Sequence, residues 1–100
     1  MTKFELFCMI FYVLDAEWDE TKNKHLGTFL SAANPFLIED AGSADPVVYK
    51  EFCKVVDESI TVEDSYEQAS AYIDSLHDQT ISDAFKSIDR PEWLDCVRDY

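Results

Sequence analysis

The sequence predicts an all-α fold, a compact single-domain bundle of five to six helices over residues 1–100. The chain has 100 residues, a length at which one hydrophobic core accounts for the whole domain. Hydrophobic residues make up 47% of the sequence, well above the composition of disordered chains. Glycine occurs twice and proline three times, which is too few turn residues for a β-sandwich or a β-barrel. We therefore expect helices joined by few turns.

Two helices are expected in the N-terminal third. Residues 4–14 are apolar almost throughout, so their periodicity fits a buried strand or a central helix, and their length favours the helix. On a helix, spacings of three and four place one stripe of side chains toward the core: Phe4, Phe7, Phe11, Leu14 and Trp18. A second helix is expected over residues 22–33. It ends there because Pro35 restricts Asn34 to an extended conformation.

Residues 34–46 form the connection to a third helix, which Asp45-Pro46 opens as N-cap and first helical residue. Gly42 is expected to supply a left-handed turn residue in this loop. The loop also carries three consecutive apolar residues: Phe36, Leu37 and Ile38. They either fold back onto the core or, if exposed together, provide an apolar anchor for an interface.

Capping motifs predict the remaining helices. Thr61-Val-Glu-Asp64 is a capping-box variant that opens a fourth helix reaching to about Asp78. Thr80-Ile-Ser-Asp83 repeats this pattern and opens a short fifth helix. Asp89-Arg-Pro-Glu92 is a further cap that leads into a terminal helix.

The charge of the chain limits the kinds of partner that it can bind. Its net charge is −13, from 21 acidic and eight basic residues. Such a field repels nucleic acids and anionic membranes and attracts basic proteins, so we expect a basic protein partner and no nucleic-acid or membrane partner. The imbalance is concentrated, because lysine and arginine are absent between Lys54 and Lys86.

Acidic residues gather on one face of the predicted fourth helix. At 100° per residue, four of them fall within an arc of roughly 60°. These candidate partner-binding residues are Glu63, Glu67, Asp74 and Asp78, with Asp64 at the margin. The face is either the solvated surface of an acidic protein or a docking surface for a basic partner.

Catalytic and metal-binding groups are sparse. The two histidines, His25 and His77, lie in no recognisable motif, so an enzyme is the least favoured of three functional classes. The three cysteines have no metal-ligand spacing, and we expect packed thiols in a reduced, cytoplasmic protein: Cys8, Cys53 and Cys96. A calcium loop over residues 57–68 is rejected because Val62 occupies its glycine position. No cofactor or metal is expected.

The favoured function is that of an acidic protein-binding module. Small size, helical content and strong acidity are together similar to immunity proteins, which are bacterial inhibitors that neutralise basic nuclease toxins. This similarity is one of type without a shared motif, so no residue roles are carried over from it. The alternative is a structural or regulatory subunit that forms homo-oligomers, for which Phe36, Leu37 and Ile38 are the candidate contacts.

Overall fold

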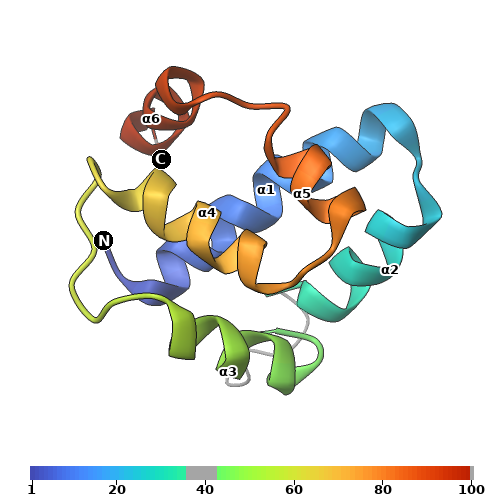
Figure 1. The fold of residues 1–100 in the computed structure, drawn as a ribbon, viewed down its shortest axis with the longest axis horizontal. Helices are drawn as coiled ribbons and strands as arrows, with labels where there is room; N and C mark the ends of the chain where they lie inside the picture. Colours follow the sequence, from blue (N-terminus) through green and yellow to red (C-terminus); the bar gives the residue numbers. More distant parts are fainter. Residues whose placement is uncertain (36–42, 100) are drawn as a thin grey trace.

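A computed structural model describes residues 1–35 and 43–99 and confirms the all-α single-domain fold (Figure 1). The Cα radius of gyration of 12.5 Å is close to the value of about 13 Å expected for a folded domain of this length. Six helices run through the described residues: α1 (Lys3–Thr21), α2 (Lys24–Ala33), α3 (Pro46–Val55), α4 (Ser65–Ser75), α5 (Gln79–Phe85) and α6 (Arg90–Asp99).

The long helix α1 is the centre of the bundle. It contacts α2, α3, α4 and α5, whereas α6 packs principally against α4. In Figure 1, α3 and α6 lie at opposite sides of the molecule, with α4 and α1 between them. This position explains why residues 4–14 are apolar almost all round: a helix surrounded by others has more than one face to bury.

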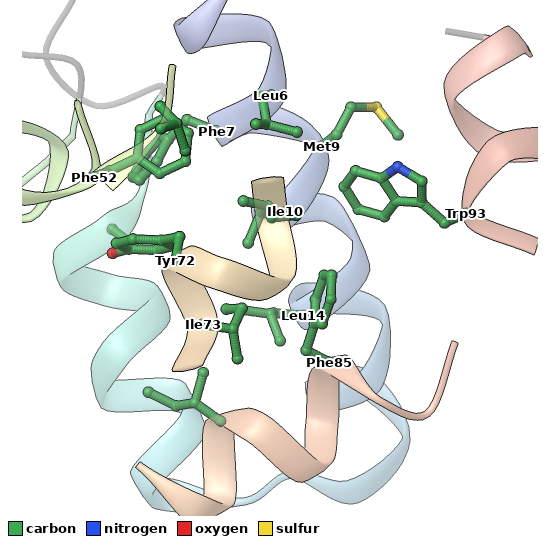
Figure 2. Packing of buried hydrophobic residues seen from close by; sticks show 14 of the residues in the cluster. Leu6, Phe7, Met9, Ile10, Leu14, Phe52, Tyr72, Ile73, Phe85 and Trp93 are labelled. Atoms are coloured by element: carbon green, nitrogen blue, oxygen red, sulfur yellow. The ribbon is translucent and has the colours of Figure 1, made fainter. Parts of the chain in front are cut away.

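Aromatic side chains from several helices fill the core around α1 (Figure 2). Phe52 of α3 lies between Phe7 of α1 and Tyr72 of α4, with ring centroids 5.0 and 4.9 Å away. Phe85 and Trp93 meet at 5.7 Å near the other end of α4. Edge-on contacts of this kind add to the free energy of burying the rings.

The predicted stripe on α1 is correct in its middle and wrong at its beginning. Phe7 and Leu14 are buried, and Phe11 and Trp18 are half-buried. Phe4, however, is 38% exposed, and it packs edge-on against Tyr49 at the rim of the core. It lies in the first turn of α1, beyond the main body of the core.

Four of the predicted helix boundaries differ from the observed ones. α2 begins at Lys24 and not at residue 22, because Lys22 adopts a left-handed conformation with φ of 54° and Asn23 caps the helix. Thr61 and Asp64 make the reciprocal capping bonds, but these close a turn, and α4 begins after it at Ser65. α4 ends at Ser75 because His77 adopts a left-handed conformation with φ of 50°. Asp78 then caps α5 by accepting a hydrogen bond from the backbone of Ile81, so α5 begins before the predicted Thr80.

Other boundary predictions are confirmed. Asp45 accepts a hydrogen bond from the Val47 N–H and places Pro46 at the start of α3. Asp89 accepts one from the Glu92 N–H, as the predicted cap of α6 requires. Within residues 1–35 and 43–99, no helix is long and apolar enough to cross a membrane.

Candidate protein-binding site

The five predicted partner-binding acids do not all lie on one helix. Glu67 and Asp74 belong to α4, whereas Glu63 and Asp64 precede it and Asp78 follows it. The predicted 60° arc of four acids required all four to lie on one helix. Because α4 spans only Ser65–Ser75, Glu63 and Asp78 lie outside it and the predicted face does not form. The candidate acids therefore form separate positions along the α4 region. The other three candidates, Phe36, Leu37 and Ile38, lie outside the described residues.

Arg90 at the start of α6 engages the N-terminal end of this region. Its Nε donates to Glu67 Oε1 at 2.7 Å, and its Nη2 donates to the carbonyl oxygen of Glu63 at 2.8 Å. The hydrogen bond from Arg90 is the main reason why the pKa of Glu67 lies below its usual value. Both side chains remain about half exposed, so the pair joins α6 to α4 without burying either charge.

Asp78 and Asp74 also contact side chains from elsewhere in the chain. Asp78 Oδ2 lies 2.5 Å from His25 Nε2 of α2, and this hydrogen bond is the main cause of the lowered pKa of Asp78. Asp74 Oδ1 lies 4.0 Å from Lys86 Nζ. The side chains of Asp74 and Lys86 are both more than 60% exposed, so their contact is weak.

Asp64 and Glu63 complete the set. The carboxylate of Asp64 accepts the Thr61 N–H at 2.9 Å and therefore serves the turn before α4. The Glu63 carboxylate forms no ion pair with a described residue. Of the five acids, Glu63 and Asp74 are thus the ones whose charge is least committed to the fold.

A groove that the sequence interpretation missed lies between α1, the segment after α5, and α6. It has a volume of about 570 Å³. Its lining includes apolar side chains, polar side chains and three glutamates. The ten lining residues are Met9, Tyr12, Val13, Ala16, Glu17, Glu20, Ser87, Ile88, Glu92 and Cys96. The sequence feature that could have indicated this groove is the apolar character of residues 4–14 on all sides of the helix. Part of that surface stays uncovered beside α6 and lines the groove.

The histidines and thiols occupy unrelated places. In the described part of the chain, no hydrogen bond joins His25 or His77 to a hydroxyl or a thiol. All three cysteines are free: Cys8 is buried, with its thiol pKa raised by burial, and Cys53 is half-buried. The expectation of a packed thiol is wrong for Cys96, which is exposed at the groove because α6 presents that side to solvent.

No group of three or more histidine, cysteine, aspartate or glutamate side chains within residues 1–35 and 43–99 is arranged to hold a metal ion. The five candidate carboxylates instead face solvent or form hydrogen bonds and ion pairs within the chain. Interaction through surface charge is the chemistry that this arrangement supports best. No family model, curated protein or solved structure matches the chain.

Proposed function

We propose that the protein is an acidic protein-binding module that docks a basic protein, in the manner of an immunity protein or inhibitor that neutralises a partner such as a nuclease toxin. The observation that carries this proposal is the one-signed surface. The net charge is −13, and the ion pairs among the described residues engage only six carboxylates. A field of this kind accelerates encounters with basic proteins more than it stabilises a fold.

The candidate acids contribute in different ways. Glu63 and Asp74 offer charge that the fold uses little, so they are the first contacts for lysine and arginine side chains of the partner. Glu67 is held in place by Arg90, and a preorganised carboxylate loses less conformational entropy when it binds. Asp64 closes the turn before α4 and Asp78 caps α5, so both add to the field while stabilising the fold. The free thiols support a reducing compartment such as the cytoplasm.

Affinity capture at low and high ionic strength tests this function. The double variant Glu63→Gln/Asp74→Asn is compared with Asp95→Asn/Asp99→Asn, which removes the same charge from exposed positions on α6. We expect a basic protein that binds the wild type at low ionic strength, is released by salt, and binds the first variant less than the second. Recovery of no basic protein at low ionic strength would remove the main support for the proposal.

Self-association is the alternative proposal. Large apolar side chains are exposed at several places among the described residues: Phe4, Tyr12, Val47 and Val55. Light scattering separates the two proposals, since a tight homodimer weakened by Phe36→Ser favours a structural or regulatory subunit. A monomer whose binding to a basic protein depends on salt favours the docking module.

A further inference from the structure

The groove between α1 and α6 has the length of a helix-binding site. Its residues from α1 recur at spacings of one and three, from Met9 to Glu20, so they form one continuous face of that helix. At 1.5 Å per residue, this face extends roughly 16 Å, the length of three helical turns. The opposite wall comes from Ile88 and from α6, including Glu92 and Cys96.

The lining of the groove combines apolar and acidic side chains. Val13 and Ile88 supply partly exposed apolar surface, whereas Met9 is only 4% exposed and belongs to the core. Ala16 leaves space between them because its side chain is small. Glu17 and Glu20 stand on α1, and Glu92 stands on α6. None of these three carboxylates forms an ion pair with a described residue.

The end of α1 makes this part of the groove especially favourable for cations. Its last turn contains Asp19 and Glu20 and no basic residue. The C-terminal end of a helix carries partial negative charge, so acids there cost about 0.3–1 kcal/mol each at low ionic strength. Lys22 lies just beyond the helix, but it pairs with Asp19 at 2.9 Å and covers the ring of Trp18. Within residues 1–35 and 43–99, the carboxylates that line the groove thus form no ion pair with a cation of the chain.

We propose that this groove binds a basic amphipathic helix of the partner, about three turns long, with its apolar face on Val13 and Ile88 and its lysine or arginine side chains at Glu17, Glu20 and Glu92. The inference rests on the proposed function, because it names the part of the basic partner that docks. Charge complementarity selects this occupant over a second copy of the chain, since two surfaces of net charge −13 repel each other.

The test uses a synthetic amidated helix of leucine and lysine, about 14 residues long, with leucine at spacings of three and four. A control peptide has the same composition, with its leucines scattered around the helix. Binding is measured by isothermal titration calorimetry at low ionic strength. Two protein variants make the comparison sharp: Ala16→Arg places a large cation in the groove, and Ala71→Arg makes the same change at an exposed position of α4.

Ala71 lies four residues after Glu67 and three before Asp74, so its variant perturbs the acidic α4 region and leaves the groove intact. We expect the amphipathic peptide to bind more tightly than the scattered one. Ala16→Arg is expected to weaken that binding about tenfold or more, because a large side chain at the centre of an interface blocks it. Ala71→Arg is expected to have little effect. Circular dichroism checks that both variants keep the helical fold.

Other outcomes separate this inference from the proposed function. Equal binding of both peptides, or equal weakening by the two arginine variants, shows general charge attraction: it overturns the groove as a site and leaves a basic partner in place. Weakening by Ala71→Arg alone moves the docking site to α4 and likewise overturns the inference. Failure of both peptides to bind at low ionic strength contradicts the groove and the basic-partner function together.

Discussion

The indole N–H of Trp93 donates a hydrogen bond of 2.8 Å to the hydroxyl of Ser65, and both residues are fully buried. The Ser65 hydroxyl in turn donates to the carbonyl oxygen of Val62 at 2.7 Å. This chain of bonds fastens α6 to the beginning of α4, where no other buried side-chain hydrogen bond among the described residues joins the two helices. It fixes one wall of the groove relative to the rest of the bundle.

Removal of the Ser65 hydroxyl tests this connection. Ser65→Ala leaves the Trp93 N–H buried without an acceptor, which costs about 1–3 kcal/mol of unfolding free energy. Chemical denaturation followed by tryptophan fluorescence measures the loss. Ser59→Ala, at an exposed position, is the matched control and is expected to change stability by less than about 0.5 kcal/mol. Equal effects of the two substitutions would show that the buried hydrogen bond contributes nothing specific.

The approach of α1 to α2 depends on Gly27. A Cβ atom at this position would lie 2.8 Å from Trp18 Nε1, which is closer than Cβ atoms approach other heavy atoms in proteins. Glycine inside a helix ordinarily costs about 1 kcal/mol relative to alanine. Gly27→Ala would therefore ordinarily raise the unfolding free energy. We expect no such gain in the wild type, and we expect it when Trp18 is also replaced by alanine. Thermal and denaturant unfolding of the four proteins measure the coupling, and a gain of equal size in both backgrounds would contradict the steric account.

The link between α4 and α5 contains a strained residue. His77 has φ of 50°, and a residue with a Cβ atom pays roughly 1–2 kcal/mol in this left-handed region. His77→Gly is expected to raise the unfolding free energy by about 0.5–1 kcal/mol after the extra flexibility of unfolded glycine is subtracted. His77→Ala is the control, because it removes the imidazole and keeps the strain. Similar gains from both substitutions would attribute the effect to the imidazole.

The pair formed by Arg90 and Glu67 makes stability depend on pH in the acid range. The folded protein holds the pKa of Glu67 below the value of the unfolded chain, so the pair stabilises the fold above the unfolded pKa near 4.5. That contribution is lost as the pH falls through the lower, folded pKa. It is at most about 1 kcal/mol because both side chains are solvent-exposed. Glu67→Gln should flatten the decrease of the melting temperature below pH 4.5, and an unchanged pH profile in this variant would contradict the account.

How far the sequence predicts the fold depends on whether a feature is local. Asp45 and Asp89 act as caps through bonds to residues two or three positions away, so their patterns are visible in the sequence. His77 in a left-handed conformation is not, since a glycine or asparagine usually marks such a position. The predicted fourth helix consequently ran on to Asp78, and the four-residue acidic face depended on that extension.

The candidate site depends still more on tertiary contacts. The absence of lysine and arginine between Lys54 and Lys86 suggested an unpaired acidic surface. The fold brings Arg90 to Glu67 across 23 residues and His25 to Asp78 across 53 residues. Neither pairing has a sequence pattern, because each is set by how the helices pack. The groove likewise has no sequence pattern of its own, because it exists only where α6 packs beside α4 and leaves part of α1 uncovered.

The rate of association with the captured basic partner, measured by stopped-flow fluorescence over a range of ionic strength, tests the central claim most directly. The account predicts a rate that falls steeply as salt is added and that is reduced at low salt by Glu63→Gln/Asp74→Asn. The matched variant Asp95→Asn/Asp99→Asn should retain more of the rate. An association rate that does not change with ionic strength, or that is equal in the two variants and the wild type, would contradict the claim that the acidic surface steers the partner.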